Sequence, residues 1–329
     1  MDVPMIVAAQ EILTLVVSVI VLSRSSSLVV DNIVKLSRFF NVSQVAIGFV
    51  LLAVATSLPE LSVSVVSSAL GEGAIAAGNV FGSNIANILL VLGIGAYLYG
   101  LRISAGDLKD IGLVLLLTTI ISVYIVFNSS VGQKALGFPE GILLLGVFAA
   151  YVWYTLKRNK VETGNGNGQV AKKEALNAFL LFGVGVMAVL VSSGFVVSSA
   201  VSLAKSFGIS ESFIGATIIA IGTSLPELSI DLQAIRKKHY GVALGDAIGS
   251  NMANITLVLG AAAAINPIVV TLPVFITALL FAVIANTLLL YVAAVDKGMK
   301  RGAGMLFLAV YAIYLVLAFT LQINELSAP

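Results

Sequence analysis

Long apolar runs alternate with short polar segments or Gly, Pro and Asn along almost the whole chain. Most runs reach roughly 20 residues or more, the length that an α-helix needs to cross a bilayer core of about 30 Å. In the first half these runs predict helices near 5–39, 43–70, 74–98, 108–128 and 138–157. In the second half they predict helices near 175–205, 211–235, 241–264, 271–293 and 303–322. We therefore expect an all-α membrane protein with ten transmembrane helices and no strands.

Composition agrees with this pattern and excludes several classes of protein. The 329 residues are 59% hydrophobic and 10% charged, whereas soluble proteins average about 25% charged residues. A net charge of +2 is too small to indicate a nucleic-acid partner. The chain has no cysteine, which excludes disulfides and thiolate metal sites. We expect a monomer that is dissolved in the lipid bilayer and keeps its first apolar segment as a spanning helix.

Basic residues predict which loops face the cytoplasm. A polar segment, 158–174, contains the letters GNGNG and reads as a flexible linker. With this linker in the cytoplasm, nearly all loop Lys and Arg residues fall on the same side, and Lys134 and Lys205 remain outside. This positive-inside distribution predicts a multi-pass protein of the plasma membrane with a cytoplasmic linker and both termini extracellular.

The two halves, 1–157 and 175–329, contain the same motifs. ATSLPELS in the first half returns as GTSLPELS in the second, and GSNIANILLVLG returns as GSNMANITLVLG. The repeated motifs span 53–93 and 220–260, and each second-half residue is numbered 167 higher than its counterpart, as Glu227 is to Glu60. Because each half holds an odd number of predicted helices, the chain should form two inverted five-helix repeats. Inverted repeats with interrupted helices are typical of secondary transporters, whose ion sites lie near the midplane.

Each TSLPE motif places oxygen-bearing groups on one face of its helix. Positions i, i+3, i+4 and i+7 lie together on a helix. These positions hold Ala53, Thr56, Ser57 and Glu60 in the first half and Ala220, Thr223, Ser224 and Glu227 in the second. Pro59 and Pro226 cannot donate a backbone hydrogen bond, so each should bend its helix and free a carbonyl oxygen beside the carboxylate.

The next helix of each half adds further oxygen atoms. They come from Ser83, Asn87, Ser250 and Asn254, which follow a GxxxG pattern that lets helices approach closely. Carboxylates, amides, hydroxyls and carbonyls without nitrogen or sulfur ligands suit a hard cation, and calcium takes about 6 to 8 oxygens. Two glutamates neutralise its charge. We expect calcium at Glu60 and Glu227 and no cofactor beyond the transported ions.

Charged residues inside the predicted helices differ in how strongly they indicate function. A carboxylate at the bilayer centre costs several kcal/mol, so Glu60 and Glu227 are expected to be functional, whereas a lone Ser or Thr is more often a packing residue. Asn254 supplies an oxygen without titrating, which should leave the two glutamates as the sole carboxylates of the site. Asp246 is expected near the cytoplasmic end of its helix, either drawing in cations or simply hydrated. Arg24 should snorkel or face the bundle interior.

At these motifs the chain resembles the sodium/calcium exchangers of the cation/calcium exchanger superfamily, in particular prokaryotic members without calcium-sensing domains. The resemblance implies that Glu60 and Glu227, with the carbonyls of Thr56 and Thr223, bind calcium. It also implies two flanking sodium sites, one made by Glu60, Ser83, Ala220 and Ser224 and the other by Glu227, Ser250, Ala53 and Ser57, with Asn87 and Asn254 beside them. Exchange would proceed by alternating access, as the first and sixth helices slide over a static core.

Other functions fit the sequence less well. A calcium/proton exchanger of the same superfamily is the main alternative, because two carboxylates can trade one calcium for two protons. A cation channel is disfavoured because paired glutamates in an inverted repeat build an occluded site. An enzyme lacks a catalytic constellation, since no cysteine and no serine with an adjacent base is present. We expect an electrogenic calcium/sodium antiporter, which is not an enzyme.

Overall fold

The computed structural model describes residues 3–103, 105–130, 136–158, 171–206, 222–268 and 272–327, and most of them are helical. The first half contains α1 (Val3–Phe40), α2 (Gln44–Ile47), η1 (Gly48–Leu52), α3 (Ala53–Thr56), α4 (Leu58–Ala69), α5 (Gly73–Ile85), η2 (Ala86–Leu92), α6 (Gly93–Tyr99), α7 (Ala105–Ser130) and α8 (Phe138–Arg158), where η marks a π-helical stretch. The second half contains α9 (Lys172–Ser206), α12 (Leu225–Arg236), α13 (Tyr240–Ala253), η4 (Asn254–Val258), α14 (Leu259–Ile265), α15 (Leu272–Asp296) and α16 (Arg301–Ser327). Each predicted helical range contains helix, and the range 211–235 is described from residue 222 onward.

The helices are long and apolar enough to make this a multi-pass membrane protein. Among the described residues, seven helices have the length and hydropathy to cross a membrane. A bent pair, Gln44–Thr56 and Leu58–Ala69, meets at 47° and brings the count to eight if it forms one span. A shorter apolar helix covers Ile111–Ile125.

The expectation that strands are absent is wrong at one small element. β1 (Leu101–Arg102) and β2 (Gly298–Met299) pair antiparallel, with Leu101 opposite Met299. They lie in the connections after α6 and before α16. There the backbone has left its helix, and its N–H and C=O groups need other partners. Hydropathy detects long apolar runs and cannot detect a pairing of two-residue strands.

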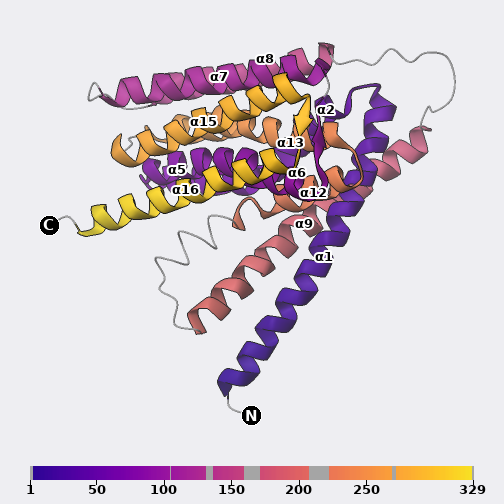
Figure 1. The fold of residues 1–329 in the computed structure, drawn as a ribbon, viewed down its shortest axis with the longest axis horizontal. Helices are drawn as coiled ribbons and strands as arrows, with labels where there is room; N and C mark the ends of the chain where they lie inside the picture. Colours follow the sequence, from indigo (N-terminus) through magenta and orange to yellow (C-terminus); the bar gives the residue numbers. More distant parts are fainter. Residues whose placement is uncertain are drawn as a thin grey trace.

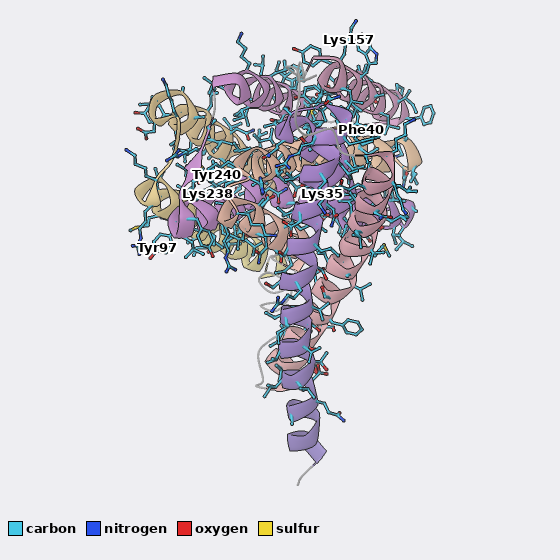
Figure 2. All side chains as sticks on the ribbon, turned by 90° about the vertical axis from the view of Figure 1, so that its right-hand side faces the viewer. Lys35, Phe40, Tyr97, Lys157, Lys238 and Tyr240 are labelled. Atoms are coloured by element: carbon cyan, nitrogen blue, oxygen red, sulfur yellow. The ribbon has the colours of Figure 1, made fainter. Side chains whose placement is uncertain are left out.

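Helices α1 and α9 pack along each other and project from the body formed by the other helices (Figures 1 and 2). At this seam Gly185 of α9 faces α1, since a Cβ placed there would lie 2.9 Å from Val29 Cγ2. The residue after α12 ties this body to α1: Lys237 Nζ donates to Ser27 Oγ at 2.6 Å and forms an ion pair with Asp31 Oδ1 at 2.7 Å.

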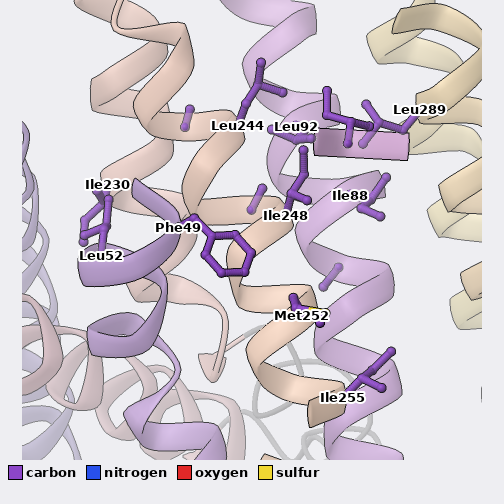
Figure 3. Packing of buried hydrophobic residues seen from close by; sticks show 14 of the residues in the cluster. Phe49, Leu52, Ile88, Leu92, Ile230, Leu244, Ile248, Met252, Ile255 and Leu289 are labelled. Carbon is purple, nitrogen blue, oxygen red and sulfur yellow. The ribbon is translucent and has the colours of Figure 1, made fainter. Parts of the chain in front are cut away.

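Helix α13 forms the centre of the body and is buried along most of its length. Figure 3 shows it between two elements of the first half. Phe49 and Leu52 approach from η1 on one side, and Ile88 and Leu92 from η2 on the other. All four side chains are buried. This packing brings the two repeated motifs into contact.

Two glycines allow α13 to approach α2, η1 and α3 so closely. A Cβ added at Gly245 would collide with the carbonyl oxygen of Val45. One added at Gly249 would lie 2.8 Å from both Phe49 Cα and Ala53 Cβ. Contacts this short involve backbone atoms, which cannot rotate away. The prediction that the GxxxG patterns permit close helix approach is therefore confirmed for the second pattern. It is wrong for the first, where among the described residues a Cβ at Gly78 meets no atom within 4 Å and one at Gly82 meets Tyr314 Oη at 3.9 Å.

The substitution Gly249→Ala should destabilise the fold. Overpacking a tight contact typically costs about 1–3 kcal/mol, so we expect a lower melting temperature in thermal unfolding of the purified protein in detergent. Gly146→Ala on α8 is the matched control, because Gly146 is exposed and a Cβ there meets no atom within 4 Å among the described residues. Equal melting temperatures for both variants would contradict this account of the contact.

Candidate ion-binding site

Both TSLPE motifs lie at interruptions of their helices. Ser57 ends the helical run with φ −79° and ψ 7°, and α4 begins at Leu58. Its counterpart Ser224 has φ −92° and ψ 10°, and α12 begins at Leu225. Pro59 and Pro226 fall in the first turn of the new helix, where a missing N–H leaves no partner unsatisfied. The bend predicted from Pro59 is confirmed by the 47° angle between the flanking helices.

These interruptions bring Glu60 and Glu227 into the first turn of α4 and α12. The free N–H groups and the positive end of the helix dipole stabilise a carboxylate at this position. Each glutamate is only 1% exposed, and the two side chains are close enough to interact electrostatically. Ser83 Oγ donates to Glu60 Oε1 at 3.4 Å, as expected if both groups serve one site.

Four asparagines join the two halves in a nearly symmetric arrangement. Asn84 Nδ2 donates to the carbonyl of Asn251 at 3.3 Å, and Asn251 Nδ2 donates to the carbonyl of Asn84 at 3.1 Å. The predicted ligands complete the arrangement: Asn87 Nδ2 donates to Asn251 Oδ1 at 3.2 Å, and Asn254 Nδ2 donates to Asn84 Oδ1 at 3.1 Å. With their amide nitrogens engaged, Asn87 and Asn254 present their oxygens as the free ends.

Buried oxygen atoms that receive no hydrogen bond from the part of the chain that the structure describes occur here in symmetric pairs. They are Ser57 Oγ and Ser224 Oγ, Glu60 Oε2 and Glu227 Oε2, and Asn87 Oδ1 and Asn254 Oδ1. In each pair the second residue is the repeat counterpart of the first. Buried polar atoms are almost always partnered, and leaving one unsatisfied costs about 1–3 kcal/mol. An oxygen-lined cluster of this kind is suited to a hard cation.

The remaining predicted ligands are placed as follows. Thr56 Oγ1 and Ser250 Oγ lie 3.4 Å apart, which brings the first motif against the second. Ala53 is buried beside α13. Thr223 lies in the turn before α12. Ala220 falls outside the described residues.

Two further carboxylates correct the sequence-based description of the site. Asp246 is fully buried inside α13, and Thr56 Oγ1 donates to its Oδ1 at 3.1 Å. The expectation that it is hydrated near a helix end is therefore wrong. Asp231, which the sequence reasoning missed, is also fully buried. Glu60 and Glu227 are thus not the sole carboxylates of this region. Asp231 follows Glu227 by four residues, and that helical spacing was the available signal.

The described residues offer a particular kind of ligand set. No three Asp, Glu, His or Cys side chains in the described part of the chain converge closely enough to form a metal site on their own. A cation held here therefore depends on hydroxyl, amide and backbone oxygens as well as carboxylates. Such mixed oxygen sets bind Ca²⁺ or alkali cations rather than transition metals.

Arg24 is remote from this cluster. It is exposed, and it lines a hollow of about 530 Å³ beside α1 and α12 together with Ser23, Ser27, Gln233, Arg236 and Lys237. Of its two predicted placements, the one facing the bundle interior is wrong.

Buried carboxylates at interrupted helices of a multi-pass membrane protein define a membrane ion transporter. More specifically, the chain belongs to the sodium/calcium exchanger protein family, whose model matches residues 11–157 and 177–320. Among its relatives, an uncharacterised membrane protein of Methanocaldococcus jannaschii is 34% identical, with 85% of this chain and 88% of the relative covered. The sodium/calcium exchanger MaX1 of Methanosarcina acetivorans is 28% identical, with 93% and 98% covered.

A solved structure agrees with this membership. The sodium-calcium exchanger NCX_Mj, soaked with 10 mM Na⁺ and no Ca²⁺, superimposes with a TM-score of 0.80 at 30% identity. The match covers 94% of this chain and 98% of that one. The chain is thus an antiporter of the exchanger family, and the prediction of family from the paired TSLPE motifs is confirmed.

Proposed function

We propose that this antiporter exchanges calcium for sodium across the plasma membrane by alternating access. The observation that carries the proposal is the set of three symmetric pairs of buried oxygens without donors. Such a set is stable when a cation supplies the missing positive charge. The names of MaX1 and NCX_Mj, both sodium/calcium exchangers, support the same pair of ions.

Calcium would bind between Glu60 and Glu227, assisted by the carbonyls of Thr56 and Thr223. Two carboxylates balance its charge, and they are drawn from opposite halves of the chain. Sodium would occupy the flanking hydroxyl-rich positions, Ser83, Ala220 and Ser224 with Glu60, and Ala53, Ser57 and Ser250 with Glu227, while Asn87 and Asn254 add amide oxygens. Because both ions need the same glutamates, calcium and sodium would exclude each other, which is the basis of exchange.

The proposed topology is ten spans in two inverted repeats, with the linker 158–174 cytoplasmic, both termini outside and a monomer as the working unit. Local conformations support the repeat. Gly71 and Lys238 are counterparts by the offset of 167, and both have positive φ, 87° and 64°. The π-helical stretches η2 and η4 also fall at matching positions. The projecting pair α1 and α9 is suited to slide over the remaining helices.

Replacing either central glutamate should abolish exchange. Glu60→Gln and Glu227→Gln keep the side-chain shape but remove a charge that binding a divalent cation requires. We expect calcium uptake into sodium-loaded proteoliposomes to fall to the level of empty vesicles, while size-exclusion profiles remain unchanged. Glu72→Gln, an exposed glutamate between α4 and α5, is the control and should transport normally. Uptake close to wild type in either buried variant would refute the assignment.

Sodium coupling predicts that transport responds to voltage. Exchange of more than two sodium ions per calcium moves net charge, and each charge is worth about 2.3 kcal/mol per 100 mV. Calcium uptake driven by a sodium gradient should therefore increase when the sodium-loaded interior, from which net positive charge leaves, is clamped positive. Uptake that requires a pH gradient and ignores sodium would instead establish a calcium/proton exchanger.

The inverted topology predicts opposite labelling of equivalent turns. Single cysteines at Glu72 and Lys238, both exposed, lie within one residue of the repeat offset, and the native chain has no cysteine to interfere. In intact cells a membrane-impermeant maleimide should label the first from outside, and the second only after permeabilisation. Labelling of both from one side would exclude inversion.

A further inference from the structure

The two repeats differ in chemistry at one pair of buried positions. In the first half Asn79 Nδ2 donates to Ser64 Oγ at 3.0 Å, so the two neutral side chains satisfy each other. Their counterparts, 167 residues later, are Asp246 and Asp231. A neutral hydrogen-bonded pair in one half is thus replaced by two carboxyl groups in the other.

The two aspartates face each other in the interior of the body. Both are 0% exposed, and their carboxyl groups are close enough to interact electrostatically. Asp246 Oδ1 accepts from Thr56 Oγ1 at 3.1 Å and from Ser250 Oγ at 3.5 Å. Among the described residues, no donor reaches Asp246 Oδ2 or either carboxylate oxygen of Asp231. Three of the four carboxylate oxygens are therefore unsatisfied.

This arrangement requires a positive charge that the described side chains do not supply. A buried carboxylate is stable when it is paired with a charge or a metal, and two in contact also repel each other. In the described part of the chain the ion pair found joins Lys237 to Asp31 and leaves these aspartates without a basic partner. Either a bound cation or a proton shared by the two carboxyl groups would supply it.

The ligands available here favour a small monovalent cation over calcium. They are the free carboxylate oxygens of Asp231 and Asp246 and the hydroxyl oxygens of Thr56 and Ser250. A hydroxyl can donate to Asp246 and still offer a lone pair to a cation. Calcium takes about 6 to 8 oxygens, and no third carboxylate among the described residues converges with this pair to form a metal site. With one monovalent ion bound, one negative charge of the pair remains. The hydroxyl groups of Thr56 and Ser250 stabilise it, because both donate to Asp246 Oδ1.

We propose that Asp231 and Asp246, with Thr56 and Ser250, bind a sodium ion at a site that the first half lacks. The choice of sodium among monovalent cations rests on the proposed function. This site is additional to the flanking sodium positions, but it shares Ser250 with one of them and Thr56 with the calcium position. Its occupancy would therefore be coupled to the central site and would make the two halves unequal in their affinity for sodium.

A direct count of bound sodium tests the proposal without relying on transport. Purified full-length protein in detergent, freed of calcium by a chelator, is titrated with ²²Na⁺ to saturation. The double variant Asp231→Ser/Asp246→Asn installs the pair that the first half already uses. We expect it to bind one sodium ion fewer per chain than wild type. Asp296→Asn, which removes an exposed carboxylate at the end of α15, is the control and should leave the count unchanged.

The single variant Asp246→Asn guards against a misfolded double variant. This variant keeps Asp231 and the shape of the site. We expect the affinity for the additional sodium ion to fall roughly tenfold or more, a loss seen even when a residue that only supports a metal ligand is replaced. Thermal unfolding and size exclusion establish that each variant is folded.

An equal sodium count in wild type and folded variants would overturn the proposal. If wild type then also releases, on raising the pH, a proton that the double variant does not release, the pair binds a proton instead. Failure of the proposed exchange would appear separately, as wild-type vesicles that do not trade calcium for sodium.

Discussion

The structure is governed by the need of buried carboxylates and amide oxygens for positive charge. Water satisfies such groups at a surface, but Glu60 and Glu227 are buried among helices, where an unpaired charge is costly. Two devices of the fold reduce that cost before any ion arrives. Each glutamate lies in the first turn of a helix, and the buried serine and asparagine oxygens of the same cluster would share a cation under the proposed function. The helix interruptions at Ser57 and Ser224 serve this arrangement, because a continuous helix has no N-terminus at that depth.

Rigid contacts around the cluster keep these oxygens in place. The amide nitrogens of the four asparagines are engaged across the interface between the halves, so the oxygens of Asn87 and Asn254 cannot turn away from the site without breaking a hydrogen bond. The close approach of α13 at Gly249 removes the space in which Ala53 could shift. A preorganised set of ligands loses less free energy on binding than one that must be assembled, and an exchanger that releases its ion in every cycle benefits from moderate rather than extreme affinity.

Much of this architecture could be predicted from sequence, because two strong signals coincide. Apolar runs predict helix positions that agree with the described elements, and the paired TSLPE motifs identify the family and indicate two glutamates that the structure shows to be buried. The errors arose where those signals do not apply. Hydropathy treats Asp246 as a polar residue near a helix start and cannot report that α3 covers it. Asp231 was not predicted because the repeat is recognised by the residues that both halves share, whereas Asp231 differs from its counterpart Ser64. The two-residue strands depend on where α6 and α16 meet in space.

The contact between Lys237 and α1 has a mechanical consequence. Its ammonium group reaches Ser27 and Asp31 through a flexible stem of four carbons, which can extend or fold while the charged end stays attached. A planar guanidinium, by comparison, holds its partners in a fixed orientation. Lys237 therefore links α1 flexibly to the residue after α12, and this link would permit a short displacement of α1 along its neighbours while opposing a larger one. Because Asp31 is exposed on this surface, dissolved salt screens the pair and weakens the link.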